Sequence, residues 1–347
     1  MLFYCNQVLH ATWIRSTYLE LEALGFRCAI VTESRHPIPL LPGARTYRGS
    51  ASLLRRLNAP VLVTAVSGVP RERLHQNVRF HVHMPHSLVS LHMAYPEGAF
   101  DGYDLIFACG EHHIAEVVAL RRLRPHWRAT ALPVGYGKSD ELRRELRALK
   151  LPDSKRRPHV VVAPSWGERN LLDSLGLELV RELLECGYDV TVRPHPGGVA
   201  NAARVCSLLR ERYGNCDRFR LELPTAGSGS LLDADLMISD YSGVALEYAF
   251  LRELPVLYVD VPHKAFNNDW NSVGLVPLEL SVREVVGKVV AAETHAILSG
   301  ARELLASSQR FVQAIRVARS KYCFNYGTCG KSAARAIGDL LSDASVF

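Results

Sequence analysis

Three short polar segments in the second half of the chain contain residue types that bind phosphate. They are Pro164-Ser165-Trp166-Gly167, Arg193-Pro194-His195-Pro196 and Ser239-Asp240-Tyr241-Ser242-Gly243. Each segment directly follows an apolar run that is typical of a buried strand. Ligands of open parallel sheets bind at the carboxyl ends of strands, where the chain turns into a helix. The position of the three segments therefore predicts a binding site for an anionic ligand.

The Arg-Pro-His-Pro segment holds one imidazole between two prolines. Proline fixes the backbone and removes a main-chain donor, so this is a costly way to build an ordinary turn. A rigidly held His195 beside Arg193 suits a phosphate group. When protonated, His195 could also stabilise the charge that develops on a leaving phosphate. The alternative is a histidine that is satisfied inside the core.

The Ser-Asp-Tyr-Ser-Gly segment opens a predicted helix over residues 242–251. Hydroxyls and a glycine at a helix start favour an anion, because free backbone N–H groups and the helix dipole point toward it. Asp240 or Ser242 could equally serve only as a helix cap. Glu247 lies one turn past Gly243 on the same face, where it could reach a ribose or the hydroxyls of a donor.

The first of the three segments follows the strand expected at residues 160–163. The hydroxyl of Ser165 could contact a donor phosphate, and Trp166 could form a wall of the binding site. The alternative is a plain turn between a strand and a helix.

The first half of the chain contains a cluster of histidines, His81, His83, His86 and His92. His81 and His83 alternate along a predicted strand and face the same side, as zinc ligands could. No cysteine or carboxylate within the cluster completes a set of four ligands, so we expect no metal and no required cofactor. His86 follows Pro85 at the end of this strand, where a neutral imidazole could take a proton from an attacking hydroxyl near pH 7.

The sequence lacks the motifs of several nucleotide-binding and hydrolytic enzymes. No GxxxxGK[ST] loop, no GxGxxG after the first strand and no GxSxG elbow occurs. These absences disfavour P-loop enzymes, dinucleotide-dependent redox enzymes and α/β-hydrolases. A further pair, His112-His113, follows a predicted strand, and we expect its rings to be solvated at a helix start.

The composition is that of a folded protein with a modest basic excess. The 347 residues fit two domains, and the formal charge of +6 favours anionic partners such as lipid headgroups. Basic residues do not alternate with aromatic ones, so nucleic acid is not an expected partner. The eight cysteines form no CxxC pair, and neither a basic leader nor an apolar run of roughly 18 residues occurs. We therefore expect a cytoplasmic protein that could lie peripherally on the inner face of the membrane.

Two series of alternating strands and helices must position these residues. The strands expected in the first half cover residues 2–5, 28–32, 61–65, 78–82, 105–108 and 129–132, and a helix covers 12–24. After a basic linker region at 138–158, strands are expected at 160–163, 189–193, 236–239 and 255–259, with helices at 170–185, 200–213, 242–251, 281–293, 301–321 and 331–341. This rhythm predicts an α/β protein with two doubly wound domains, residues 1–150 and 151–347, that face a central cleft. The last helices could pack back on the first domain.

The combined motifs resemble the CDP-glycerol glycerophosphotransferase family of teichoic-acid and capsule synthesis. The resemblance rests on Val161-Val-Ala-Pro-Ser-Trp166, Val192-Arg-Pro-His-Pro196, Ile238-Ser-Asp-Tyr-Ser-Gly243 with Tyr248, and Pro255-Val-Leu-Tyr-Val-Asp260. Their order and spacing agree with the family over most of residues 80–280. The resemblance implies a GT-B fold, with two Rossmann-like domains that bind the acceptor on the N-terminal one and the nucleotide donor on the C-terminal one.

The resemblance also implies roles for individual residues. The essential histidine of the family's His-Gly-Thr-Pro motif falls at His86, after which this chain continues Ser-Leu-Val. The histidine of the Arg-Pro-His-Pro motif is His195, which would contact the donor pyrophosphate. The family's Ser-Asp-Tyr-Ser-Ser segment falls at residues 239–243, with Gly243 in the last place, and the acidic residue farther along falls at Glu247.

The implied function is the transfer of glycerol phosphate, or a related alditol phosphate, from a CDP-activated donor. The acceptor would be a hydroxyl of a lipid-linked or polymeric glycan, and CMP would be released. One alternative is a GT-B glycosyltransferase that uses a CMP-activated acid sugar, such as Kdo or sialic acid, or another nucleotide sugar. Others are a non-hydrolysing sugar 2-epimerase and a non-catalytic nucleotide-binding protein.

Overall fold

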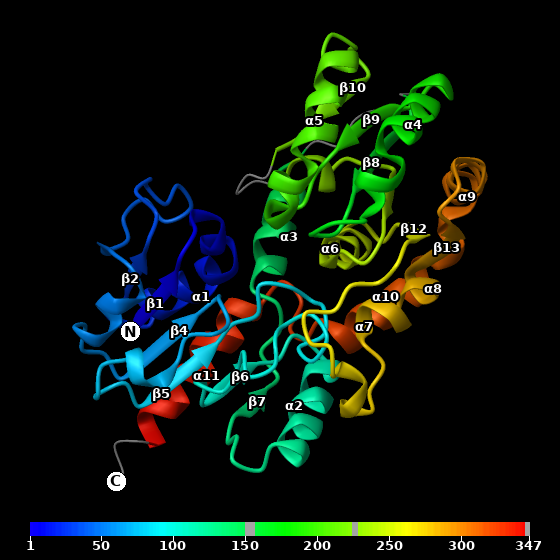
Figure 1. Cartoon of the computed structure of the whole chain (residues 1–347). Helices are drawn as coiled ribbons and strands as arrows, with labels where there is room; N and C mark the ends of the chain where they lie inside the picture. Colours follow the sequence, from blue (N-terminus) through cyan, green and yellow to red (C-terminus); the bar gives the residue numbers. More distant parts are fainter. Residues whose placement is uncertain (150–156, 224–227, 344–347) are drawn as a thin grey trace. The chain divides into compact units, whose positions relative to one another are not determined.

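The computed structural model describes residues 1–149, 157–223 and 228–343, which form two compact units. Unit 1 contains Met1–Arg144, Ala265–Pro277 and the chain from Arg319 onward, and unit 2 contains Glu145–Lys264 and Leu278–Ala318 (Figure 1). The sequence analysis placed residues 151–347 in the second domain, with last helices that could pack back on the first. The chain from Arg319 lies in unit 1, in agreement with that possibility, whereas Ala265–Pro277 also lies in unit 1 and was not expected there. Residues 150–156 of the expected linker are outside the described residues.

Unit 1 is built on a parallel sheet of seven strands. Their order is β3-β2-β1-β4-β5-β6-β7. The strands are β1 (Leu2–Cys5), β2 (Ala29–Thr32), β3 (Thr46–Arg48), β4 (Val61–Thr64), β5 (Phe80–His83), β6 (Leu105–Phe107) and β7 (Thr130–Leu132). Every strand pair is parallel, so all seven carboxyl ends lie along one edge.

The helices of unit 1 cover both faces of this sheet. Along β1, Phe3 and Cys5 face one core and Leu2 and Tyr4 face the other, as the alternation of side chains along a strand requires. The first core packs against α1 (Ala11–Ala23) and α11 (Cys329–Asp343), which lie side by side. The second core includes Val117 of α2 (Glu111–Leu123). The 3-10 helices of this unit include η1 (Val8–His10) and η6 (Trp270–Val273).

Unit 2 is built on a second parallel sheet, of six strands. Their order is β10-β9-β8-β11-β12-β13. The strands are β8 (His159–Ala163), β9 (Asp189–Val192), β10 (Phe219–Leu221), β11 (Leu236–Ser239), β12 (Val256–Asp260) and β13 (Gly287–Ala291). The helices are α4 (Leu171–Glu185), α5 (Val199–Tyr213), α6 (Gly243–Arg252), α7 (Leu278–Ser281), α8 (Arg283–Val286) and α9 (Thr294–Ser307). Two further helices, α3 (Lys138–Ala148) and α10 (Val312–Tyr322), run across the boundaries between the units.

The structure corrects two of the expected helices. Residues 281–293 were expected to form one helix, but β13 occupies their second half and pairs with all of β12. Valines on both sides of Gly287 favour a strand, and a Cβ on Gly287 would lie 1.9 Å from the carbonyl oxygen of Val256. The helix expected at 301–321 is divided into α9 and α10 by a 3-10 helix at Ser308–Phe311. The short edge strands β3 and β10 were not expected.

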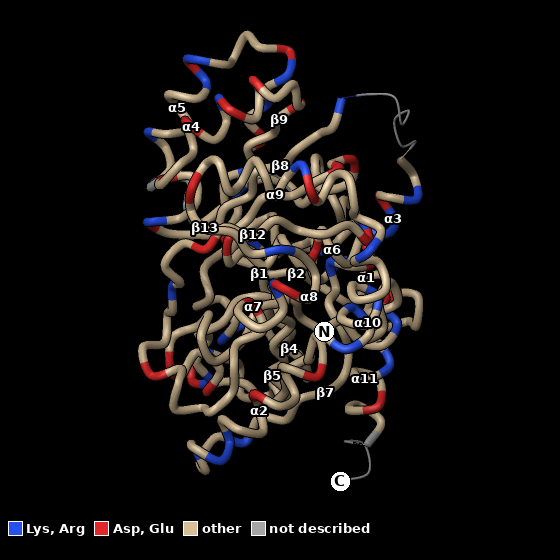
Figure 2. Tube along the Cα trace, turned by 90° about the vertical axis from the view of Figure 1, so that its right-hand side faces the viewer, with Lys and Arg blue, Asp and Glu red and all other residues tan. Residues whose placement is uncertain are grey.

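The structure also describes the state of the cysteines, the distribution of charged residues and the character of the helices. All eight cysteines are free thiols. Lys and Arg are interspersed with Asp and Glu along the trace (Figure 2). Within the part of the chain that the structure describes, no helix is both long enough and apolar enough to cross a membrane.

Candidate functional site

The three polar segments of unit 2 lie on neighbouring strands of one sheet. β8 lies between β9 and β11, and all three strands are parallel. The segments at residues 164–167, 193–196 and 240–243 therefore leave the same edge of the sheet. A Cβ built on Gly197 would lie 4.0 Å from the Cβ of Trp166, so the first two loops lie close together.

Asp240 joins two of these loops with its carboxylate. It is completely buried, and its oxygens accept N–H groups from Ser165 at 2.6 Å, Leu171 at 3.1 Å and Tyr241 at 2.7 Å. Ser239 has a similar role, because its hydroxyl donates to the carbonyl oxygen of Ala163 at 2.6 Å. These contacts fix the loops after β8 and β11 to each other. The alternative of Asp240 as the cap of α6 is wrong, since Ser242 holds that position.

The first turn of α6 has main-chain N–H groups that can donate hydrogen bonds to a ligand. Ser242 is the N-cap residue, and its side chain makes no capping hydrogen bond. The N–H groups of Gly243 and Val244 have no partner within the helix, because the first turn of any α-helix lacks acceptors for them. On the loop that Asp240 ties to this turn, the hydroxyl oxygen of Ser165 is buried without a hydrogen-bond partner, in a residue only 2% exposed. This turn and hydroxyl are suited to an anionic oxygen.

The ring of His195 is oriented by its own loop. The N–H of Gly197 donates to Nδ1 of His195 at 3.0 Å. In the neutral ring the proton is therefore on Nε2, which makes Nε2 the donor that a phosphate oxygen would accept from.

Arg193 pairs with a carboxylate that the sequence analysis did not identify. Its guanidinium forms an ion pair with Glu222 of the loop after β10. Burial lowers the pKa of Arg193, and the nearby Glu247 carboxylate opposes that shift. Glu247 is itself buried in α6. Arg193 and Glu247 thus lie close to each other in the structure, while their contacts with a donor stay predictions.

Two further side chains, Lys264 and Arg283, contact the predicted donor residues. Lys264 donates from Nζ to the carbonyl oxygen of Trp166 and lies 5.6 Å from its ring centroid. Arg283 lies 4.5 Å from the ring centroid of Tyr241, whose hydroxyl donates to Asp260 at 3.1 Å. Burial raises the pKa of Tyr241 to about 12. Sequence reasoning missed both cations because neither belongs to a motif, although Lys264 closely follows the carboxyl end of β12.

In unit 1, His86 follows the carboxyl end of β5, and its ring is oriented by the backbone. Its Nδ1–H donates to the carbonyl oxygen of Ala65 at 2.8 Å. Burial lowers the pKa of His86, and this hydrogen bond only partly offsets the effect. The remaining nitrogen, Nε2, makes no hydrogen bond with any described residue. A half-buried imidazole with its Nε2 lone pair available has the form that a general base needs.

Two other histidines of the cluster, His81 and His83, belong to the core. Nδ1 of His81 bonds the carbonyl oxygen of Gly102 at 2.6 Å, and its ring stacks on Tyr103 at 4.0 Å. His83 is buried against Phe100 and Tyr103, and burial places its pKa well below the ordinary value. Among the residues the structure describes, no group of three or more His, Cys, Asp or Glu is arranged to hold a metal ion.

The expectation that His112 and His113 are solvated is wrong. His113 is buried and His112 is half-buried, burial lowers the pKa of both rings, and each bonds a carbonyl oxygen of the loop that follows His86. His112 bonds Leu88 and His113 bonds Val89, each through Nε2 at 2.9 Å. The start of α2 packs against this loop, which explains the burial. The pair thus fixes the chain next to His86.

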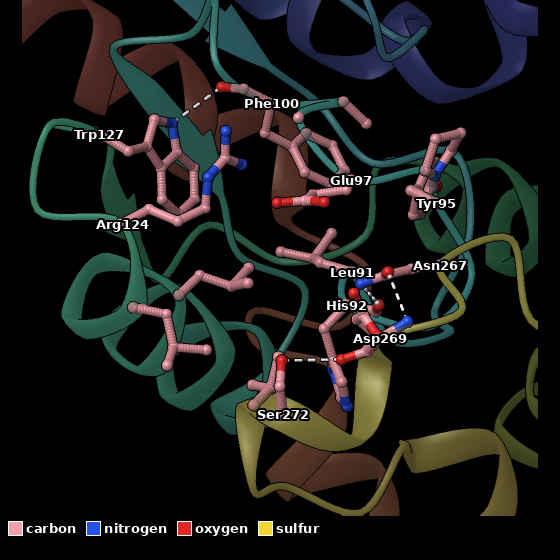
Figure 3. Close-up of a pocket in the computed structure, with 16 residues that line it drawn as sticks. Leu91, His92, Tyr95, Glu97, Phe100, Arg124, Trp127, Asn267, Asp269 and Ser272 are labelled. Atoms are coloured by element: carbon pink, nitrogen blue, oxygen red, sulfur yellow. Dashed lines mark hydrogen bonds between the residues drawn. The ribbon is translucent and has the colours of Figure 1, made fainter.

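Unit 1 also contains a pocket with a cavity volume of 170 Å³, and none of the predicted site residues lines it. Its walls are largely apolar and aromatic, with Tyr95, Phe100 and Trp127 on one side and Asp269 and Ser272 of the η6 region on another (Figure 3). Trp127 donates from Nε1 to the carbonyl oxygen of Phe100 at 2.9 Å. Of the predicted residues, neither His86 nor any donor-binding residue lines this pocket.

Comparison with known proteins identifies the fold. No protein-family model and no curated protein matches the chain. A solved structure of the wall teichoic acid polymerase TagF, in a variant soaked with CDPG, is 15% identical, with a TM-score of 0.62 over 99% of this chain and 88% of that one. The UDP-GlcNAc 2-epimerase from Neisseria meningitidis bound to UDP-GlcNAc is 13% identical, with a TM-score of 0.64 over 98% of each chain. The epimerase from Methanocaldococcus jannaschii in complex with UDP-GlcNAc and UDP is 14% identical, with a TM-score of 0.61 over 98% of each. These likenesses and the two parallel sheets confirm the GT-B fold that the sequence predicted.

Proposed function

We propose that this protein transfers glycerol phosphate, or a related alditol phosphate, from a CDP-activated donor to a hydroxyl group of an acceptor. The observation that carries the proposal is the anion-binding turn of unit 2. There the free N–H groups at the start of α6 and the buried, unpartnered hydroxyl of Ser165 lie on loops joined by Asp240. The likeness to TagF, which was soaked with CDPG, supports a donor of this class.

In the proposed reaction, a hydroxyl oxygen of the acceptor attacks the β-phosphorus of the donor. A new O–P bond forms, the bond from that phosphorus to the oxygen bridging the α-phosphate breaks, and CMP leaves with the bonding electrons. Nε2 of His86 takes the hydroxyl proton, because Nδ1–H is committed to Ala65. The reaction requires the acceptor at His86 to reach the donor on unit 2.

The residues of unit 2 would bind the departing phosphate. Nε2–H of His195 and the N–H groups of Gly243 and Val244 donate to its oxygens, and the dipole of α6 favours its charge. Positioning and charge stabilisation account for most of the acceleration in phosphoryl transfer. The acceptor in this proposal is a lipid-linked or polymeric glycan, and the formal charge of +6 would favour contact with anionic headgroups.

A second candidate is a UDP-sugar enzyme of the 2-epimerase type. The specific observation that favours it is the likeness to epimerases solved with UDP-GlcNAc or UDP, over 98% of the chain. In that case the same anion-binding turn would hold the diphosphate of a UDP-sugar, and no CMP would be formed.

The test is a donor panel with phosphate-site variants. Purified protein is incubated with CDP-glycerol, CMP-sialic acid, CMP-Kdo or UDP-GlcNAc, and the products are identified by mass spectrometry. CMP release from CDP-glycerol is expected, with a loss of roughly 100-fold in His195→Ala. The matched control is His295→Ala, whose side chain is 82% exposed and which should match wild type. Equal CMP release in wild type and His195→Ala would contradict the phosphate-binding role, and conversion of UDP-GlcNAc alone would favour the epimerase.

A further inference from the structure

A second histidine, His10, lies against His86 on the same edge of the unit 1 sheet. His10 ends η1 and immediately precedes α1, in the connection that leaves the carboxyl end of β1. β4 alone separates β1 from β5, the strand that leads to His86. The rings of His10 and His86 stack, with centroids 5.8 Å apart and planes 25° apart. The topology of the sheet therefore brings two imidazoles, 76 positions apart in the sequence, into one group.

Trp13 fixes the arrangement of this histidine pair. Its indole meets the edge of the His10 ring at 5.5 Å and of the His86 ring at 5.9 Å. Its Nε1–H donates to the hydroxyl of Tyr136 at 2.6 Å, and that hydroxyl donates to the carbonyl oxygen of His86 at 3.1 Å. Because of this chain of contacts, both the ring and the backbone of His86 are held in place.

Two buried polar atoms in the connection that leaves the carboxyl end of β1 lack partners. Nδ1 of His10 and Oδ1 of Asn6 are both buried and make no hydrogen bond with any residue the structure describes. A buried polar atom without a partner costs roughly 1–3 kcal/mol, so a ligand that supplies the missing bond to such an atom gains binding free energy. The amide oxygen of Asn6 only accepts hydrogen bonds, so its partner must donate one. A hydroxyl can donate, whereas a phosphate dianion cannot.

Both rings are suited to a neutral ligand. Burial lowers the pKa of His10 to about 3, and the neighbouring His86 ring adds to this shift. Burial also lowers the pKa of His86. At neutral pH the pair is uncharged, and neutral imidazoles hydrogen-bond hydroxyls without attracting an anion.

We propose that His10 is an acceptor-binding residue, which together with Asn6 holds the polyol end of the acceptor so that its reacting hydroxyl lies against Nε2 of His86. This inference rests on the proposed function. It narrows the acceptor of the proposed transfer to a polyol chain or a sugar that presents adjacent hydroxyl groups. His86 takes the proton, and His10 positions the hydroxyl-bearing carbons. Water, which has no second hydroxyl group, reaches His86 without help from His10.

The test compares transfer to glycerol with hydrolysis. Full-length protein is given CDP-glycerol, and phosphorus NMR separates glycerophosphoglycerol, formed by transfer, from glycerol phosphate, formed by hydrolysis. His10→Phe retains a ring against His86 and Trp13 but removes both nitrogens. It is expected to raise the KM for glycerol about tenfold, while the KM for CDP-glycerol and the rate of hydrolysis stay within about twofold of wild type. His36→Phe, at an exposed histidine of the same unit, should leave all three quantities unchanged.

Two results would overturn the role of His10. One is an unchanged KM for glycerol in His10→Phe, which would mean that only water occupies the site. The other is an equal loss of transfer and hydrolysis, which would mean that the ring merely supports His86. If wild type releases no CMP from CDP-glycerol, the proposed function fails, and His10 is then tested by NMR of nitrogen-15-labelled histidine rings during a glycerol titration. Saturable shifts of the His10 nitrogens that disappear in Asn6→Leu would support polyol binding, and unshifted nitrogens would overturn it.

Discussion

The carboxylate of Asp240 accepts the main-chain N–H of Ser165 at 2.6 Å, and this contact joins two loops that are 75 residues apart in the sequence. Two more N–H groups, from Leu171 and Tyr241, bond the same carboxylate. A completely buried carboxylate is stabilised only when its oxygens are satisfied in this way. Asp240 thus holds the loop after β8 and the start of α6 in a fixed relation.

Replacing Asp240 by alanine is therefore expected to destabilise unit 2. The change leaves three donors without their acceptor, and we expect a loss of about 3 kcal/mol in the free energy of unfolding. Asp240→Asn retains one acceptor oxygen and should lose about half as much. Urea unfolding followed by circular dichroism measures both. The exposed Asp217→Ala serves as the control and should stay within about 0.5 kcal/mol of wild type. Wild-type stability in Asp240→Ala would show that this carboxylate does not join the loops.

Ser165 and Ser239 are expected to respond in opposite ways to alanine. The hydroxyl of Ser165 has no partner, so Ser165→Ala should leave stability unchanged but weaken CDP-glycerol binding about tenfold. The hydroxyl of Ser239 donates to Ala163, so Ser239→Ala should lower the free energy of unfolding by about 1 kcal/mol. Thermal unfolding and calorimetric titration with CDP-glycerol distinguish the two. A destabilised Ser165→Ala with normal binding would contradict the donor role of that hydroxyl.

The sequence predicted the central strands well because strands of a parallel sheet are buried on both faces. That burial produces continuous apolar runs such as Val160 to Ala163. It predicted β13 wrongly, because polar residues at helical spacing within 281–293 favour a helix, although valines flank Gly287. The strand forms because β12 offers a free edge, and this is a tertiary effect that a local pattern does not contain.

The candidate site was predictable only in part. The rule that ligands bind after parallel strands located the loops at Ser165, His195 and Ser242, and the structure brings these loops to one edge of the sheet. The same rule applied to the loop after β1 would have drawn attention to Asn6 and His10. The contacts of Asp240 could not be predicted, because they depend on how β8 and β11 pair over a long separation in the sequence.

The pH dependence of the reaction should reflect the neutral state of His86. A general base acts when it is deprotonated, and burial holds the pKa of His86 below its ordinary value of about 6.5. The rate of CMP release at limiting donor should therefore fall about tenfold per pH unit only at pH values below that shifted pKa. From about pH 6.5 to 8 it should stay level. His86→Gln should remove most of the activity and this acidic decline together. An acidic decline centred above pH 7 would exclude His86 as the base.

Unit 1 should lose stability when the pH falls below about 6.5. Burial lowers the pKa of His10 to about 3 and those of His81 and His113 to about 4, whereas the unfolded chain titrates near 6.5. At pH values between the pKa of a histidine in the folded protein and its pKa in the unfolded chain, the unfolded state binds more protons than the folded state. Acid therefore favours unfolding. Each such histidine contributes a slope of about 1.4 kcal/mol per pH unit within its window. The buried carboxyl of Glu116, whose pKa is raised, has the opposite sign and offsets part of the loss.

The variant His81→Gln isolates the contribution of His81 to the pH dependence of the free energy of unfolding. Glutamine can still donate to the carbonyl oxygen of Gly102, as Nδ1 of His81 does at 2.6 Å, but it does not titrate. Urea unfolding at pH values from 4.5 to 7.5 should show a shallower dependence of stability on pH in this variant, by about 1.4 kcal/mol per pH unit between about pH 6.5 and 4. The exposed His36→Gln is the control and should retain the wild-type slope. Parallel curves for wild type and His81→Gln would mean that His81 is protonated in the folded protein, contrary to its burial between β5 and Tyr103.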